Sequence, residues 1–303
     1  MRSIVIGNQE LNIKDYHCAQ DGDYLDKPDG KLWLYVNLTD ICNGKCRFCI
    51  NPSVKDGKDK IDPSSYREML IRIKDYIYGV SLTGGEPMLF PELANEIISI
   101  THEICGSHVE KDIVTNGTGF AGILNSLDVE HLDSVHLSRH MITDRENDAV
   151  FGLTTVSAEE IATVVAKMDD PAQIVFNCVL MAGGVDTTQR ISHYLEFASG
   201  LGVRNVSFIG LSRHNEFCED NYIDPRQLDM SHDARFHIWN EYRDHEYCSC
   251  SSGSYDAGNG SIRFYYRRMG EKKAPYARQL VYTADGRLLA GFTGKEIRFD
   301  KDK

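Results

Sequence analysis

The sequence predicts an α/β fold: a partial (β/α)6 barrel of the TIM type with a small C-terminal α+β cap. From Lys31 onward, short apolar runs with strand character alternate six times with amphipathic helical runs. Such repeats require parallel strands joined by right-handed crossovers. The alternation stops after Leu211, where a Gly- and Ser-rich stretch and hairpin signals follow. We therefore place an N-terminal hairpin extension at residues 1–30, the core barrel at 31–213 and the cap at 214–303.

The first half of the chain contains clear start and stop signals. Asp62 precedes Pro63, which is typical of an N-cap followed by proline at the first helical position. Apolar residues at helical spacing then predict one buried helix face, made of Tyr66, Met69, Leu70, Ile73 and Ile77. The elements predicted here are a hairpin over 4–13 with its turn at Gly7-Asn8, a strand over 32–38, the helix after Asp62, a strand over 80–82 and a helix from Pro91.

The second half continues the pattern as far as residue 210. Ser157 and Glu160 form a capping box ahead of an apolar helical run. The predicted elements are strand 112–115, short helix 120–127, strand 134–137, the helix after Ser157, strand 174–180, a helix from Asp186 to Gly200 and strand 205–210. Beyond the barrel we expect a helix over 234–242 and two or three strands, including a hairpin that turns at Asp285-Gly286.

Composition and charge narrow the function classes. The 303 residues include 45 acidic and 33 basic side chains, for a net charge of −12, whereas binding to nucleic acid usually requires a basic face. No apolar run is long enough to cross a membrane, and the N-terminus is too polar for a signal peptide, so we expect a cytoplasmic protein. The basic stretch 263–273 is either a solvated strand and turn or a platform for an anionic substrate or acidic peptide.

Nine cysteines in a reducing compartment call for an explanation other than disulfides. Cys42, Cys46 and Cys49 follow the first barrel strand, at the end of the barrel where active sites form. Three thiolates so close together suit a compact metal centre. Either they hold a [4Fe-4S] cluster with one iron left open, or they belong to a zinc site completed by a distant fourth ligand. The scattered Cys18, Cys105 and Cys178 are typical of ordinary buried residues.

The spacing of this cysteine triad, with Phe48 before its last member, resembles the signature of the radical S-adenosylmethionine (SAM) superfamily. The resemblance implies that the open iron of one [4Fe-4S] cluster binds SAM. It implies that an electron from a donor such as flavodoxin or ferredoxin then cleaves SAM to a 5′-deoxyadenosyl radical, which removes a hydrogen atom from the substrate. The protein's part is to orient the cofactors and to exclude side reactions.

Segments at the ends of the following strands resemble the SAM-binding motifs of the same superfamily. Asn177 either contacts SAM or satisfies backbone groups at a strand end. His140 is either a structural histidine or a substrate contact and proton shuttle. The SAM contacts that the resemblance implies are Phe48, Gly84, Gly85, Glu86 and Pro87 of the first two motifs, Thr115 and Asn116 after the third strand, and Asn177 on the fifth. Ser138 and Arg139 after the fourth strand depart from the sequence that many relatives have there, but their hydroxyl and guanidinium suit the ribose and carboxylate of SAM.

The region from Ile174 onward resembles one branch of the superfamily, that of the GTP cyclase of molybdenum-cofactor biosynthesis and of peptide-modifying enzymes with twitch or SPASM extensions. Residues 278–292 resemble a twitch hairpin, but Ala274, Ala277 and Gly291 stand where the cyclase has cysteines for a second cluster. The resemblance therefore implies a twitch-like cap and a single cluster. Three roles stay open for the remaining cysteines of the cap, which are Cys218, Cys248 and Cys250. They form an auxiliary cluster, donate a hydrogen atom to a substrate radical, or are ordinary thiols.

Three functions stay open at this stage. The first is modification of a ribosomally made peptide by epimerisation, crosslinking or excision, for which the aromatic and basic strand near Phe264 offers a groove. The second is radical conversion of a small metabolite such as a sugar or nucleoside. The third is a non-catalytic iron–sulfur or zinc protein, which the Gly-Gly-Glu-Pro and Ser-Arg segments argue against, because a structural metal requires neither.

Overall fold

The computed structural model describes residues 2–13, 31–51, 54, 57–224, 227–231, 233–244, 248–269, 275–292 and 294–299. Its described strands form one twelve-stranded sheet in the order β14-β13-β12-β3-β4-β5-β6-β7-β8-β11-β10-β9, and a separate two-stranded hairpin. Six consecutive parallel strands form the centre of the large sheet. They are β3 (Leu32–Thr39), β4 (Ile77–Gly84), β5 (Glu110–Thr115), β6 (Ser134–Ser138), β7 (Ile174–Leu180) and β8 (Asn205–Gly210). The predicted α/β class with a partial barrel is confirmed.

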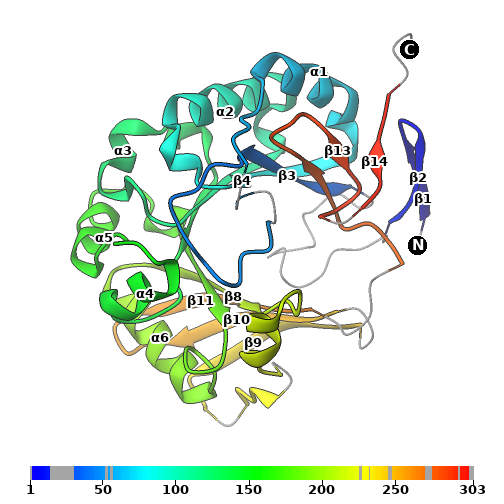
Figure 1. Cartoon of the computed structure of the whole chain (residues 1–303). Coiled ribbons are helices and arrows are strands. Elements are labelled where there is room, and N and C mark those ends of the chain that lie inside the picture. The colour runs from blue at the N-terminus through cyan, green and yellow to red at the C-terminus, as the bar shows by residue number, and fades with distance from the viewer. Residues whose placement is uncertain are drawn as a thin grey trace.

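Helices connect these strands and line the outside of the curved sheet (Figure 1). They are α1 (Pro63–Ile73), α2 (Pro91–Cys105), α3 (Ile123–Ser126), α4 (Asp144–Phe151), α5 (Ala158–Val165) and α6 (Thr188–Gly200), with α7 (Glu216–Asp220) after the last barrel strand. Short 3₁₀ turns occur at Lys74–Tyr76, Pro87–Leu89, Gly106–His108, Phe120–Gly122, Val129–His131 and Pro171–Gln173. Within the described residues, no helix is both long enough and apolar enough to span a bilayer.

Both edges of the barrel sheet are extended by strands from the C-terminal region. β11 (Ser261–Met269) pairs in parallel with β8 and is followed outward by β10 (Cys248–Asp256) and β9 (Phe236–Asp244). At the other edge, β12 (Gln279–Tyr282) pairs in parallel with β3, followed by β13 (Leu288–Leu289) and β14 (Glu296–Ile297). The strands on either side of the predicted boundary at 213–214 therefore belong to one sheet.

The N-terminal hairpin, β1 (Arg2–Ile6) and β2 (Gln9–Ile13), has the predicted turn and packs against the end of the chain. The Asn8 amide donates to the carbonyl of Arg298 at 2.9 Å, and the Ala277 amide donates to Asn12 at 2.7 Å. The remaining residues of the predicted 1–30 extension, which include Cys18, lie outside the described part of the chain, as does Ala274.

Side chains on each strand alternate between two different environments. On β8, Phe208 faces the helices and packs 5.7 Å from Tyr194 of α6, so Ser207 must face the opposite side. On β3, Trp33 also lies on this opposite side and donates to Ser81 of β4 at 2.8 Å. We call this side, opposite the helices, the lumen face. Closed TIM barrels fill the equivalent space with branched apolar side chains, whereas this lumen face carries many polar groups.

Local signals explain the helix starts. The Asp62 carboxylate accepts the Ser65 amide at 2.8 Å, and the capping box of Ser157 and Glu160 is present as predicted. Two predicted boundaries were wrong by a few residues. Ile77 begins β4 instead of ending α1, and α6 is capped by Thr187, while Asp186 accepts the Gly183 amide of the preceding turn.

The helix predicted over 234–242 was wrong, because this segment forms most of β9. Its backbone pairs antiparallel with β10 along the strand, which satisfies the hydrogen bonds that a helix would have made internally. Phe236 packs against Tyr255 at 4.7 Å and Phe264 at 5.6 Å. Tertiary pairing thus overrode a weak local helical pattern.

Candidate functional site

The cysteine triad lies in the loop after β3, at the carboxyl end of the parallel strands. Cys42, Cys46 and Cys49 are free thiols and each is partly buried. Burial raises the pKa of Cys42, and it raises the pKa of Cys46 to about 12, with nearby Cys49 and Cys42 adding to the effect. The three thiols are therefore close enough for their charges to interact. In the described residues, no three metal-binding side chains already converge as a cage for a single ion.

The donor set fits an iron–sulfur cluster. Three thiolates on one short loop, at the active end of a barrel, are the ligands that such a cluster takes from protein. The positive charge of bound iron would offset the burial and repulsion that raise the pKa of Cys42 and Cys46 in its absence.

The Gly84-Gly85-Glu86 segment at the end of β4 runs in backbone contact with the start of the triad loop. The Gly85 amide donates to the Thr39 carbonyl at 2.6 Å, and the Glu86 amide donates to the Ile41 carbonyl at 2.9 Å. A Cβ atom on Gly85 would lie 2.1 Å from the Ile41 oxygen, and one on Gly84, where φ is +114°, 2.6 Å from the Thr39 oxygen. Glycine is required here because the two backbones approach too closely for a side chain.

Glu86 links the ends of β4 and β5 from inside the protein. Its carboxylate, 1% exposed, accepts the Met88 amide at 2.9 Å, the Thr115 hydroxyl at 2.7 Å and the Asn116 amide at 2.7 Å. Burial raises the pKa of Glu86 to about 7, although the three hydrogen bonds oppose the shift. Pro87 is buried in the 3₁₀ turn that follows. The carboxylate thus fixes the two loops that resemble SAM-binding motifs.

The loop after β5 clamps the triad loop between its first two cysteines. Asn116 donates from Nδ2 to Asn43 Oδ1 at 2.9 Å, and Asn43 donates from Nδ2 to the Thr118 hydroxyl at 2.8 Å. Thr118 in turn donates to Asn116 Oδ1 through its amide at 3.0 Å and its hydroxyl at 2.7 Å. We did not predict Asn43 or Thr118. The available signal in the sequence was the asparagine that lies between the first two cysteines of the triad.

Two other segments hold the remaining sides of the triad loop. The Lys45 amide donates to the carbonyl of Phe151, the last residue of α4, at 2.7 Å. After β8, His214 Nε2 lies 3.0 Å from the Cys49 carbonyl oxygen, and Asn215 Nδ2 donates to the Arg47 carbonyl at 3.0 Å. The loop is therefore held by residues from four regions of the sequence, and nothing in its local pattern indicated His214 or Asn215.

Comparison with known proteins identifies the family of this chain. The model of the Radical SAM superfamily matches residues 36–198, which is more than half of the chain. This chain belongs to the radical SAM superfamily. It is an enzyme, and the cofactors of its family are a [4Fe-4S] cluster and SAM.

The curated relatives of this radical SAM enzyme are GTP 3′,8-cyclases and related proteins. It is 26% identical over 193 residues to GTP 3′,8-cyclase of Aquifex aeolicus, a match that covers 61% of this chain and 58% of the relative. It is 26% identical to Molybdenum cofactor biosynthesis protein 1 of Mus musculus, over 57% of this chain and 28% of the relative. The chain thus spans only part of the length of the relatives that it matches.

Among solved structures, SuiB of Streptococcus suis bound to precursor peptide SuiA has the same fold. The TM-score is 0.64 at 13% identity, and the likeness covers 92% of this chain and 64% of SuiB. SuiB bound to S-adenosylmethionine gives a TM-score of 0.61 at 14% identity, over 88% of this chain and 62% of SuiB. The likeness therefore reaches beyond the residues that the family model matches.

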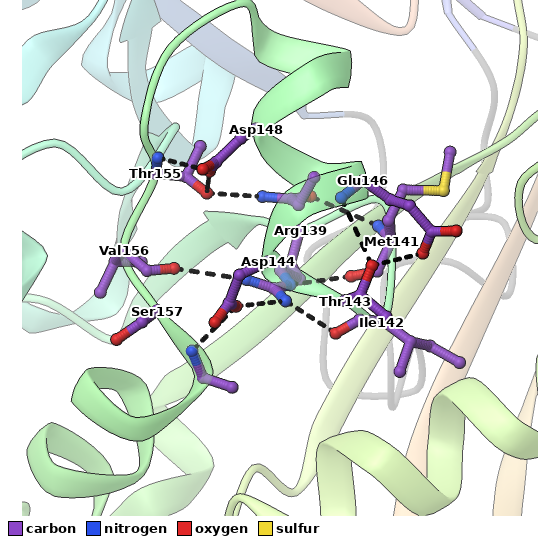
Figure 2. A network of polar contacts seen from close by, with 12 residues as sticks. Arg139, Met141, Ile142, Thr143, Asp144, Glu146, Asp148, Thr155, Val156 and Ser157 are labelled. Carbon is purple, nitrogen blue, oxygen red and sulfur yellow. Dashed lines mark hydrogen bonds and ion pairs between the residues drawn. The ribbon is translucent and has the colours of Figure 1, made fainter.

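The predicted role of Arg139 in binding SAM requires correction. Its side chain is 1% exposed and holds the loop between β6 and α4 (Figure 2). Nε donates to Met141 O at 2.8 Å, and Nη2 donates to Ile142 O at 2.7 Å and Asp144 Oδ1 at 2.8 Å. Nη1 lies 3.3 Å from Val156 O. Because each guanidinium nitrogen already has a protein acceptor, we infer that Arg139 is structural. Ser138 lies partly exposed beside Asn177 in the sheet register, and its SAM contact stays a prediction.

His140 is a core residue, which favours the structural alternative over the proton shuttle. Its ring packs 5.1 Å from Phe48 and 5.0 Å from Phe151, and Nδ1 accepts the Val179 amide at 3.2 Å. Burial lowers the pKa of His140 to about 3, so the ring is neutral at physiological pH and does not exchange protons there. Phe48 itself is partly buried and packs against an apolar cluster that contains Cys218.

We predict that His140 makes the cluster-free protein less stable in mild acid. Its unfolded-state pKa is 6.5 and its folded-state pKa is about 3, so below pH 6.5 the unfolded chain takes up the proton and the folded chain does not. The unfolding free energy should therefore fall as pH decreases, with a slope that approaches about 1.4 kcal/mol per pH unit from this residue. Urea unfolding between about pH 7.5 and pH 5 measures the slope.

The matched variant is His140→Phe, which keeps an aromatic ring against Phe48 and Phe151 but has no titrating group. It should be less stable overall, because the Val179 amide loses its acceptor, and its slope should be shallower than that of the wild type. Equal slopes for the two proteins would show that His140 titrates normally.

Asn177 lies on the lumen face of β7 and is already paired. Its Oδ1 lies 3.2 Å from His136 Nδ1, and His136 Nε2 lies 3.1 Å from the Ser134 hydroxyl. Asp112 of β5 lies 3.9 Å from the same His136 nitrogen. The printed contact of the Asn177 side chain is with a side chain and not with the backbone groups that we expected, and its SAM contact stays a prediction. These residues build a polar patch on the lumen face of β5, β6 and β7.

The three remaining candidate cysteines lie on different elements. Cys218 is buried on α7, and its Sγ is 3.9 Å from His214 Nε2, next to the triad loop. Cys250 is buried on β10, and the side chain of Cys248 lies outside the described part of the structure. An auxiliary cluster formed by these residues stays a prediction. Cys105 and Cys178 are buried, as expected for ordinary core residues.

Proposed function

We propose that this radical SAM enzyme modifies a ribosomally made peptide. The observation that carries the proposal is the extension of the sheet beyond the six barrel strands, where β11, β10 and β9 continue the lumen face past β8. A wall of this length offers contacts to several residues of an extended chain. The likeness in fold to SuiB, whose structure contains a precursor peptide, supports the same class of substrate.

In this proposal Cys42, Cys46 and Cys49 hold the cluster. When bound, it would supply the electron that cleaves SAM to a radical, and that radical would take a hydrogen atom from the peptide. The chain's own contribution is to keep the loop rigid. Glu86 and the Asn43–Asn116 clamp fix the loop from two adjacent strand ends. Rigid placement matters because a hydrogen transfer requires the reacting atoms to be held close and aligned. The electron comes from a donor such as flavodoxin or ferredoxin.

Cys250 is a candidate hydrogen-atom donor within the same proposal. It is in register with Arg267 of β11, and it lies two positions from Ser252, so both residues share the lumen face of β10. In an epimerisation, the S–H bond of the thiol breaks and a C–H bond forms on the substrate radical. The thiyl radical that is left returns to the thiol by taking one electron from the electron donor and one proton from water.

A second candidate function is conversion of a small polar metabolite. The patch formed by Asp112, His136 and Asn177 on the lumen face favours it, because buried polar groups of this kind suit a ligand with several hydroxyl or amino groups. GTP cyclisation itself is disfavoured, since by the resemblance Ala277 and Gly291 stand where the cyclase has cysteines for its second cluster.

The test is anaerobic turnover of reconstituted enzyme with SAM and dithionite, with and without candidate peptides, chosen first from any short open reading frames that lie beside its gene. We expect the peptide to stimulate 5′-deoxyadenosine formation and to change in mass, through loss of hydrogen for a crosslink or uptake of deuterium from D₂O for an epimer. A peptide that leaves the rate unchanged and stays unmodified, while a nucleoside or sugar stimulates turnover, would instead establish the second function.

A further inference from the structure

Three residues form a straight row across the extended part of the sheet. Ser207 of β8 is in register with Tyr265 of β11, and Tyr265 is in register with Ser252 of β10. Residues in register share a face of the sheet, so all three lie on the lumen face. Their neighbours confirm the assignment, because Phe208 packs 5.7 Å from Tyr194 of α6 on the opposite face.

Two of the three hydroxyl groups, those of the serines, are buried. Ser207 is 1% exposed and Ser252 is 2% exposed, and neither hydroxyl has a hydrogen-bond partner among the described residues. Buried hydroxyls are normally paired, because leaving one unpaired forfeits its hydrogen bonds to water. Both hydroxyls are covered by other residues in the ligand-free chain, so a ligand that enters the lumen reaches them only when these residues move aside. Two such groups on the same face, on either side of one tyrosine, mark the place where it would bind.

The spacing of the two hydroxyls suits a peptide backbone. Adjacent strands lie roughly 4.8 Å apart, so Ser207 and Ser252, two strands apart, are separated by roughly 9–10 Å. That distance corresponds to about three residues of an extended chain. A serine hydroxyl both donates and accepts, so it pairs equally well with a carbonyl or an amide N–H, and it carries no charge that would select for a charged side chain.

We propose that Ser207 and Ser252 bind main-chain amides of the substrate peptide and hold it across the lumen. The inference rests on the proposed function and deepens it: recognition is directed at the backbone of an extended segment, without selection for a charged side chain. Both serines are positioning residues, since they hold the peptide and do not touch the cluster loop. Tyr265 forms the part of the wall between them.

The chain itself offers a matched control. Ser251 precedes Ser252 on β10, is also 2% exposed, and its hydroxyl also has no partner among the described residues. It is in register with Tyr266, however, and so lies on the face that the helices cover. Ser251→Ala therefore removes the same buried, unpaired group from the same strand, but on the wrong side for the substrate.

The experiment uses reconstituted holoenzyme with SAM and a displayed library of linear peptides. Peptides that bind wild-type enzyme and also stimulate 5′-deoxyadenosine formation are synthesised, and their dissociation constants are measured by fluorescence anisotropy. We expect Ser207→Ala and Ser252→Ala each to weaken binding about fivefold, the double variant to weaken it about 25-fold, and Ser251→Ala to leave it unchanged.

Thermal unfolding of the same variants separates binding from folding. Removing an unpaired buried hydroxyl should leave the melting temperature equal to or above that of the wild type. If stimulating peptides bind the double variant as tightly as the wild type, or if Ser251→Ala weakens binding as much, the serine row does not hold the substrate, although peptide modification stands. If no peptide in the library stimulates turnover, the proposed function itself fails.

Discussion

Replacing Cys46 by alanine is expected to leave the protein folded but colourless, with iron reduced from about four atoms per chain to near zero and no 5′-deoxyadenosine above background. The two remaining thiolates, Cys42 and Cys49, do not retain a cluster that needs three protein ligands. The fold should survive, because the loop is fixed by contacts that do not involve the thiol, such as the Lys45 amide to Phe151 and Asn215 to Arg47. Iron analysis, visible absorbance and product chromatography measure the outcome.

The control for this variant is Cys105→Ala, which also removes one thiol but lies at the end of α2, away from the triad loop. It should keep its iron and its activity. Cys218→Ala addresses the auxiliary cluster: about four irons in both wild type and variant supports one cluster, whereas about eight in the wild type and about four in the variant supports two. A Cys46→Ala protein that keeps its colour and iron would contradict the assignment of the triad.

Replacing Gly85 by alanine is expected to destabilise the protein by about 1–3 kcal/mol and to reduce iron retention, although the change adds a single methyl group. Its Cβ would lie 2.1 Å from the Ile41 carbonyl oxygen, which is backbone and not a movable side chain. Either the contact between the two segments opens, with loss of the Gly85 amide to Thr39 and the Glu86 amide to Ile41, or the triad loop shifts. Both responses displace the residues leading into Cys42.

Urea unfolding of cluster-free protein measures the first effect, and iron content after reconstitution measures the second. Gly200→Ala is the matched control, because a methyl group added at this position, at the end of α6, would meet no described atom within 4 Å. That variant should be neutral or slightly more stable, as alanine restricts the unfolded chain more than glycine does. A Gly85→Ala protein with wild-type stability and iron content would show that the close approach is not needed.

The described strands and helices of the barrel were largely predictable because their signals are local. The cap at Asp62, the capping box at Ser157 and the alternation of apolar runs each depend on residues a few positions apart. The same holds for the triad and the Gly-Gly-Glu-Pro segment, whose spacing is readable without coordinates. Their position at one end of the barrel followed from parallel strands, whose carboxyl ends meet at one edge.

The sequence by itself thus determined the barrel, the place of the cysteine triad and the radical SAM family. Only the tertiary structure decided which polar residues are already paired and which are not. Arg139 and His140 carried the signal of functional residues but are enclosed by partners from their own and neighbouring loops. Ser207 and Ser252 carried no signal, yet both are buried and unpaired among the described residues. The reason is physical: spacing along the chain sets which elements form, whereas pairing and burial depend on the register of strands that are far apart in sequence.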